Sequence, residues 1–246
     1  MTDLPDIVYV VKPGDDNDEL RYSLRSVVNL PHRQLFVVGY TPAWVRGAIS
    51  IDVQQQATKW LSSTRNMLAA CSDPRVGEDF VYFNDDMFVM HPIDRMPIYH
   101  RGKVDDVIRE HHILVSRGKP VDTRYLNGME RTAKLLERLL RDRESLLSYE
   151  LHVPLPVRKS EMLKALAACK QLAVAHKRTV YGNLAAIGGQ QIRDVKISKV
   201  KPRWDPSWTF LSTDDEEWQR HEPDTVVVAD FVRGIFSSPG PYEARP

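Results

Sequence analysis

The sequence predicts an α/β protein with a mostly parallel sheet flanked by helices. Runs of β-branched and aromatic residues with little polar alternation occur at residues 6–11, 34–39 and 80–88, as is typical of strands that are buried on both faces. Segments of helical periodicity separate these runs. Strands that alternate with helices favour a right-handed, doubly wound sheet.

The first 90 residues supply the remaining elements of that sheet. A periodic apolar pattern predicts a helix over residues 19–28, and its acidic start suits the positive end of the helix dipole. Residues 49–53 are a short predicted strand. Residues 59–71 are predicted to be a helix with an apolar stripe of Trp60, Met67, Leu68 and Cys71.

The pattern changes after residue 90. Residues 91–125 are polar and are predicted to be irregular, and residues 126–147 are predicted to be one charged, amphipathic helix. Residues 149–157 are an extended segment that contains prolines, and a further helix is expected over 158–171. We expect a single domain made of a first half (1–90), a helical insertion (91–148) and a second half that ends in a C-terminal arm (149–246).

Composition narrows the class of protein. The 246 residues are 42% hydrophobic, which is enough for a sizeable core, and the net charge of +1 gives no overall attraction to nucleic acid or acidic membranes. Cys71 and Cys169 lie in predicted helices, so we interpret them as buried thiols in a reducing compartment. We find no signal peptide and no run of ~20 apolar residues. We therefore expect a cytoplasmic protein with no membrane partner.

Asn84, Asp85 and Asp86 follow the apolar strand that begins at residue 80. Adjacent ionised carboxylates at a strand end are costly to bury unless a positive group compensates them. Aspartate oxygens suit Mg²⁺ or Mn²⁺, so Asp85 and Asp86 are the predicted metal ligands. A polar turn with a capping aspartate is the alternative.

A second acidic cluster follows the first strand, and we expect it at the same edge of the sheet. Asp15, Asp16, Asn17 and Asp18 are more such residues than one helix cap needs, and Glu19 begins the predicted helix. Asp16, Asn17, Asp18 and Glu19 are candidates for contacts with a nucleotide, a sugar or an acceptor hydroxyl, and helix capping is the alternative. Arg21, one turn into the helix, either binds a phosphate or pairs with the acidic turn.

Cations and a histidine complete the candidate site. Lys59, Arg65 and Asn66 lie on the helix before the aspartate strand, where they would bind a diphosphate opposite the metal unless they form a solvated face. His152 is a candidate general base or phosphate ligand, although a lone histidine in an apolar frame is often a satisfied core residue. Arg178 brings a positive charge to a predicted helix start, where a phosphate could bind.

Part of this pattern resembles the nucleotide-sugar segment of GT-A glycosyltransferases. In that fold an Arg-Asn helix, here Arg65-Asn66, leads to a strand that ends in an Asp-x-Asp-type metal motif, and the motif in this sequence reads Asn-Asp-Asp. The resemblance implies a GT-A-like fold and a nucleotide-diphosphate sugar bound mainly by residues 1–90. It also implies a Mg²⁺ or Mn²⁺ ion on Asp85 and Asp86.

A second resemblance is to the Stealth family of sugar-phosphate transferases. Residues 6–9, 16–27 and 80–88 look like its first two motif blocks. Residues 150–154 resemble the third block, which would give His152 a role at the phosphate, and residues 176–178 resemble the fourth block through Arg178. The chain is also similar to phage-encoded glycosyltransferases, which would place it in a host cytoplasm.

These observations lead to three functional hypotheses. The first is a metal-dependent glycosyltransferase that moves a sugar from a nucleotide-diphosphate sugar to a hydroxyl of a virion or cell-surface protein, a glycan or a modified DNA base. The second is a Stealth-like sugar-1-phosphate transferase, and the third is a non-catalytic nucleotide-sugar or nucleic-acid binding module. The expected catalytic residues are Asp86, Asp18, His152 and Arg178. The expected substrate-binding residues are Asp16, Asn17, Glu19, Arg21, Lys59, Arg65, Asn66 and Asn84.

Overall fold

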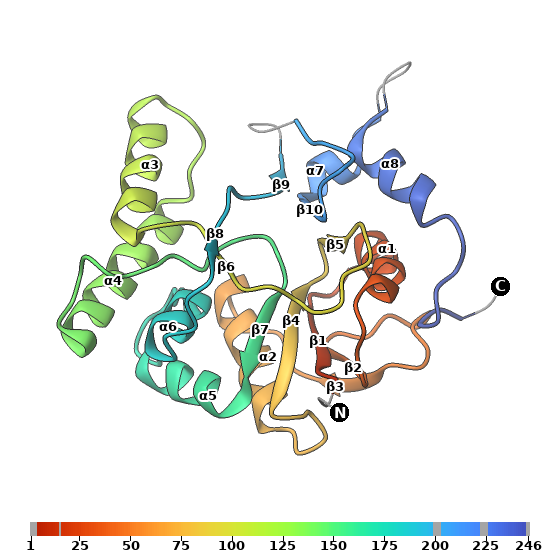
Figure 1. Cartoon of the computed structure of the whole chain (residues 1–246), viewed down its shortest axis with the longest axis horizontal. Coiled ribbons are helices and arrows are strands. Elements are labelled where there is room, and N and C mark those ends of the chain that lie inside the picture. The colour runs from red at the N-terminus through yellow and green to blue at the C-terminus, as the bar shows by residue number, and fades with distance from the viewer. Residues whose placement is uncertain (1–3, 15, 199–202, 222–225, 245–246) are drawn as a thin grey trace.

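The computed structural model describes residues 4–14, 16–198, 203–221 and 226–244. Its centre is a five-stranded sheet in the order β3-β2-β1-β4-β7 (Figure 1). The first four strands run parallel and β7 is antiparallel to β4, which confirms the predicted α/β class with a mostly parallel sheet. The strands are β1 (Asp6–Val11), β2 (Leu35–Gly39), β3 (Ile49–Asp52), β4 (Asp79–Asn84) and β7 (Leu155–Arg158).

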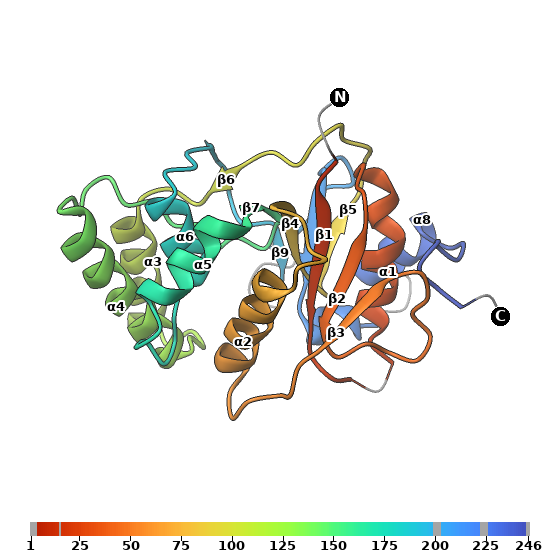
Figure 2. The ribbon, with the colours of Figure 1, turned by 90° about the horizontal axis from the view of Figure 1, so that it is seen from below.

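Helices cover both faces of this sheet (Figure 2). Alternate residues of β1 point to opposite faces. Val8 and Val10 pack in the core on the α2 side, whereas Ile7, Tyr9 and Val11 pack in the core on the α1 side. The helices are α1 (Asp18–Ser26), continued by the 3₁₀ turn η1 (Val27–Asn29), and α2 (Lys59–Ser72), α5 (Lys159–Ala168) and α6 (Lys177–Leu184).

The predicted strand over residues 80–88 is two strands separated by a turn. β4 ends at Asn84, Asp85 and Asp86 form the turn, and β5 (Met87–Val89) leaves the main sheet. β5 pairs antiparallel with β10 (Phe210–Thr213), which also pairs with β9 (Lys196–Ile197). The two aspartates therefore lie where the chain passes from one sheet to the other.

The helical insertion is more ordered than the sequence suggested. The prediction that residues 91–125 are irregular is wrong, because they contain β6 (Tyr99–His100) and α3 (Val104–Ser116). α3 buries Val104 and Val107 and exposes much of its remaining surface, so its polar composition hid the helix. α4 (Thr123–Leu140) ends earlier than expected because Arg141 adopts a left-handed conformation with φ 56°. β6 pairs with β8 (Gln190–Gln191).

The predicted strand over 149–157 is also shorter than expected. Only residues from Leu155 onward pair with β4. The backbone carbonyls of Leu151 and Val153 instead accept hydrogen bonds from the side chain of Arg178. A buried cation thus takes the place of a neighbouring strand.

The C-terminal elements lie beside α1 (Figure 1). They are α7 (Asp215–Trp218), α8 (Val228–Ile235) and an arm anchored by Glu243, whose carboxylate accepts hydrogen bonds from Arg25 at 2.6 and 2.9 Å. Cys71 and Cys169 are buried, as predicted. Within the described ranges, none of the helices has the length and apolar character needed to cross a membrane.

Candidate functional site

A cleft of about 530 Å³ opens at the edge of the sheet where β1 and β4 end. Their carboxyl ends lie side by side because the two strands are parallel, with Val10 opposite Asn84. This edge is where open α/β sheets usually bind ligands. The lining residues used below are Lys12, Thr58, Lys59, Ser63, Asn66, Asn84, Asp85, Glu150, His176 and Lys177.

Positive groups gather on this cleft. Lys12, Lys59 and Lys177 line it, together with Thr58 and His176, the N-cap residues of α2 and α6. Two helix N-termini thus open on the same cavity, and each carries partial positive charge. The Nζ of Lys177 donates to the Oγ of Ser63 at 2.7 Å and so ties α6 to α2. The arrangement suits an anion with more than one charged group.

Asn66 presents an unpaired oxygen at the base of the cleft. The residue is 2% exposed, its Nδ2 donates to the carbonyl of Val38 at 3.3 Å, and its Oδ1 has no hydrogen-bond partner among the described residues. The close approach of α2 to β2 depends on Gly39, because a Cβ there would lie 2.4 Å from the Nδ2 of Asn66. A ligand that donates a hydrogen bond would satisfy Asn66.

Glu150 provides a negative charge opposite the lysines. Its Oε1 accepts a hydrogen bond from the backbone N–H of Thr179 at 3.1 Å and lies 4.0 Å from Nδ1 of His176. Burial raises the pKa of Glu150, but the nearby charges of His176, Arg178 and Lys177 outweigh that effect and hold the pKa below its usual value. Glu150 is therefore ionised and fixes the start of α6.

The Asp85-Asp86 turn forms another wall of the site. Asp86 Oδ2 pairs with Nζ of Lys196 at 2.8 Å, and its Oδ1 is buried without a partner among the described residues. Burial and the charge of Asp86 raise the pKa of Asp85 to about 7. Glu19 is nearby: burial and the charges of Asp86 and Asp85 raise its pKa to about 8, although Thr213 donates a hydrogen bond to it at 2.5 Å. Three acidic groups thus share this corner, and burial together with their mutual repulsion raises the pKa of two of them.

The carboxylate oxygens at this turn could supply some, but not all, of the ligands of a divalent cation. Asp85 and the unpaired Oδ1 of Asp86 are hard oxygen donors, and a cation would relieve their repulsion. Within the described ranges, however, no group of three or more His, Cys, Asp or Glu side chains is placed to hold a metal. Mg²⁺ commonly takes only one or two carboxylates and completes its shell with water and substrate phosphates. Asp85 and Asp86 suit that mode.

His152 is held in a fixed orientation by two distant residues. Asp194 Oδ1 accepts from the His152 backbone N–H at 3.0 Å, and Oδ2 pairs with His152 Nδ1 at 2.8 Å. Burial raises the pKa of Asp194, but the charge and hydrogen bonds of His152 lower it more, so it lies well below its usual range. Arg178 clamps the carbonyls on either side of His152. Nε2 remains available on a side chain that is 33% exposed.

Several predicted site residues have other contacts. Arg178 is 5% exposed and binds backbone carbonyls, so the expected phosphate contact is wrong. Arg21 pairs with Glu243 at 3.2 Å and stacks on Trp44, and Arg65 is exposed outside the cleft lining. Asp18 accepts from Trp218 and Arg233, both at 3.1 Å, which anchors the C-terminal elements.

The other members of the acidic cluster differ in whether they lie near the Asp85-Asp86 turn. Asp16 is exposed, and Asn17 donates to the carbonyl of Lys12 at 3.1 Å from a left-handed conformation with φ 48°. Asp15 lies outside the described residues, and of the described members of this cluster only Glu19 lies close to the two aspartates. Asn84 lines the cleft, and its Oδ1 accepts a hydrogen bond from Tyr82 at 2.7 Å.

Lys177 belongs to the basic group, residues 176–178, that the sequence placed at a helix start, although only Arg178 was named as the phosphate contact. Sequence reasoning missed four residues of this region: Lys12, Glu150, Asp194 and Lys196. Only Lys12 carried a usable signal, because it directly follows β1. The others come from segments whose position depends on how the second half of the chain packs.

These features define an α/β protein with a charged cleft at the carboxyl edge of a mostly parallel sheet, compatible with a Rossmann-like fold. No protein-family model matches the chain, and no similar curated protein is found.

Proposed function

We propose that the protein is a glycosyltransferase that binds a nucleotide-diphosphate sugar in the 530 Å³ cleft. The observation that carries this proposal is the convergence of three lysines and two helix N-termini opposite Asp85 at the carboxyl edge of β1 and β4. Cations and helix N-termini bind phosphates, and the strand-end aspartates suit a divalent cation. The strand order and the Asn-Asp-Asp turn are compatible with a GT-A-like fold.

Each group then has a role in the proposed reaction. Lys59, Lys177 and Lys12 bind the diphosphate, and Asp85 and Asp86 are the ligands for a Mg²⁺ or Mn²⁺ ion. When bound, that ion would stabilise the charge of the departing nucleoside diphosphate. His152 accepts the proton of the acceptor hydroxyl at Nε2, because Asp194 holds Nδ1. The new bond joins the acceptor oxygen to the anomeric carbon, and the bond from that carbon to the diphosphate breaks.

A test begins with binding. We expect one or more nucleotide-diphosphate sugars to raise the melting temperature, and to do so more strongly with Mn²⁺ present, because a ligand that binds only the folded state stabilises it. Products then distinguish the mechanisms. Glycosyl transfer releases a nucleoside diphosphate, whereas sugar-1-phosphate transfer releases a nucleoside monophosphate.

Variants at the two ends of β4, one in the turn that follows it and one at its first residue, sharpen this test. Asp86→Asn is expected to lower transfer by about 10²-fold or more, since it weakens the proposed ligand for the cation. Asp79→Asn is the matched control, because Asp79 is at the opposite end of the same strand with a side chain that is 69% exposed. If no nucleotide sugar binds with or without Mn²⁺, the proposal fails.

A further inference from the structure

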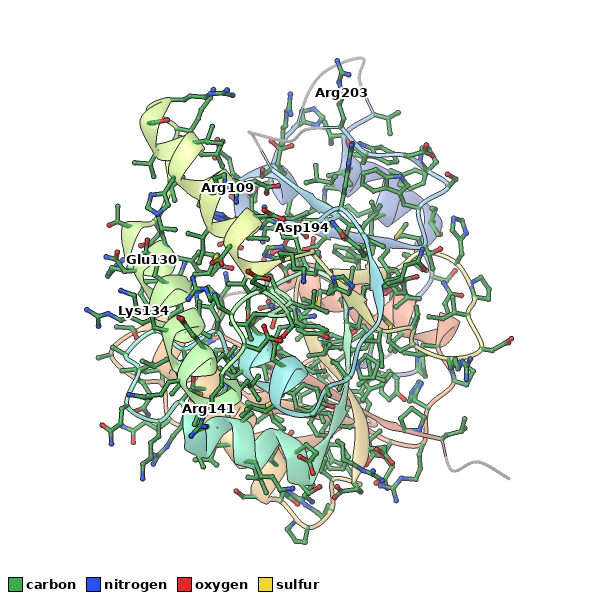
Figure 3. The ribbon with its side chains drawn as sticks, turned by 60° about the vertical axis from the view of Figure 1, so that its left-hand side comes forward. Arg109, Glu130, Lys134, Arg141, Asp194 and Arg203 are labelled. Atoms are coloured by element: carbon green, nitrogen blue, oxygen red, sulfur yellow. The ribbon has the colours of Figure 1, made fainter. Side chains whose placement is uncertain are left out.

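A second and larger cleft, of about 1340 Å³, lies beyond the Asp85-Asp86 turn. It is lined by residues 99 and 101 at β6, by residues 191–197, by residues 203 and 207–210, and by Glu110 of α3. Figure 3 labels Asp194 and Arg203, two of its lining residues, and shows α3 on the same side of the molecule. The lining residues used here are Tyr99, Arg101, Glu110, Arg193, Asp194, Lys196, Arg203 and Trp208.

Positive charge exceeds negative charge in this second cleft. Of its four cationic side chains, Arg101 pairs with Glu110 at 2.9 Å and Lys196 pairs with Asp86 at 2.8 Å. Arg193 and Arg203 are exposed and have no acidic partner among the described residues. Two arginines thus remain available to an anionic ligand, and a guanidinium suits the geometry of a carboxylate or a phosphate.

The number of unpaired arginines limits how many anionic groups a ligand of this cleft can carry. A nucleic acid strand carries a phosphate every 3.4 Å or so, and proteins that follow it usually neutralise several of them. Two unpaired arginines suit instead a ligand with one or two anionic groups. The cleft also presents the half-buried rings of Tyr99 and Trp208, which offer flat apolar faces beside the charges. Such a mixture of aromatic faces and polar groups suits the rings of a saccharide.

Two contacts connect this cleft with the proposed reaction centre. Lys196, which lines it, pairs with Asp86, while Asp85 lines the first cleft. Asp194, which also lines it, holds His152. A ligand in the second cleft would therefore have the carboxylate turn on one side and the proposed base near its other side.

We propose that the second cleft binds the acceptor, and that this acceptor is a saccharide with a carboxylate or phosphate group held by Arg193 and Arg203. The assignment as acceptor rests on the proposed transferase function. The assignment as a site for an anionic saccharide rests only on the residues of the cleft.

The experiment measures binding without a sugar donor. Calorimetry at low ionic strength uses three probes of similar size: maltotetraonate, which carries one terminal carboxylate, maltotetraose with one phosphate, and neutral maltotetraose. The first two distinguish a carboxylate from a phosphate as the preferred group. We expect at least one anionic probe to bind about fivefold or more tightly than neutral maltotetraose, and to weaken as salt is added.

Charge-removal variants locate the site. Arg193→Gln and Arg203→Gln are each expected to weaken binding of the anionic probe about three- to tenfold and to leave the neutral probe unchanged. Arg131→Gln is the matched control, because Arg131 is exposed on α4 and lines neither cleft. All these positions are on the surface, so folding is expected to be preserved, and a melting curve checks this.

Three outcomes would overturn the inference: neither anionic probe binds, both arginine variants bind like the unmodified protein, or a single-stranded oligonucleotide binds more tightly at the same residues. Donor binding measured on the same samples separates the two proposals. If the anionic saccharide binds but no sugar donor does, the proposed transferase function is refuted and the saccharide site stands. If a sugar donor binds but no saccharide does, the saccharide site is refuted and the proposed transferase function stands.

Discussion

Asp194 binds His152 through both of its carboxylate oxygens, one to the backbone N–H at 3.0 Å and one to Nδ1 at 2.8 Å. The two residues are 42 positions apart, and neither belongs to a helix or strand. The contact therefore orients a loop histidine that the central sheet does not position. In the proposed reaction this makes Asp194 a positioning residue for the base.

Asp194→Asn should impair that orientation while leaving most of the fold in place. An amide can present its NH₂ group to Nδ1 and so favour the wrong tautomer, which we expect to lower transfer by about 10²-fold or more. The ring ¹⁵N shifts of His152 would report the change of tautomer, which a merely structural role of Asp194 would not alter. Unchanged shifts together with unchanged transfer would refute the positioning role.

The contribution of Glu19 and Asp85 to stability is expected to fall as the pH rises from about 4 to about 8. The pKa of Glu19 is raised from 4.5 to about 8 and that of Asp85 from 3.8 to about 7. The folded state therefore binds more protons than the unfolded state in this range, and deprotonation opposes folding. Glu19→Gln should flatten this slope and raise the melting temperature at pH 8 by a few degrees, or roughly 1–2 kcal/mol.

Thermal unfolding at several pH values checks this expectation. Equal dependence of the melting temperature on pH in the unmodified protein and in Glu19→Gln would contradict the raised pKa of Glu19. Added Mn²⁺ should restore stability at pH 8 if the carboxylates bind it.

Lys59 and Arg65 lie on the same helix and give a matched pair of charge removals. Lys59 lines the first cleft, whereas Arg65 is exposed outside its lining. Lys59→Gln should weaken binding of a nucleotide-diphosphate sugar about three- to tenfold, since one cation near the diphosphate is lost. Calorimetry on both variants checks this. If Arg65→Gln weakens donor binding as much as Lys59→Gln does, the effect comes from the overall positive charge of α2 and not from a contact of Lys59 with the diphosphate.

Gly39 should not tolerate a side chain. It has φ +108°, and a Cβ would lie 2.4 Å from both Asn66 Nδ2 and the carbonyl oxygen of Val11. Gly39→Ala is therefore expected to cost about 2 kcal/mol or more in the free energy of unfolding. Gly118→Ala is the control: it has φ +67° but no atom within 4 Å of the added Cβ, so only the backbone strain of about 1 kcal/mol is expected.

Urea denaturation of the two glycine variants separates steric overlap from backbone strain. If Gly39→Ala is no less stable than Gly118→Ala, α2 does not pack against the end of β2 as described. Loss of donor binding in a folded Gly39→Ala protein would further link this packing to the cleft, because Asn66 would be displaced.

The sequence alone determined the frame of the molecule. The apolar runs at β1, β2 and β4 bury so much apolar surface that local pattern and tertiary position agree. In the predicted stripe of α2, Met67 and Cys71 are buried, whereas Leu68 is 40% exposed. Parallel strands place their carboxyl ends at the same edge of a sheet. The sequence therefore predicted that one edge would gather Asp85, Asp86, Glu19, Lys59 and Asn66.

Only the tertiary structure decided the partners of the charged residues. Arg178 was expected at a phosphate, yet it is buried against the carbonyls of Leu151 and Val153, because that loop has no neighbouring strand to satisfy them. Asp194, Lys177 and Lys196 reach the two clefts from short segments with little periodicity. Periodicity reports which face of an element is buried, but which charges meet depends on how distant segments pack.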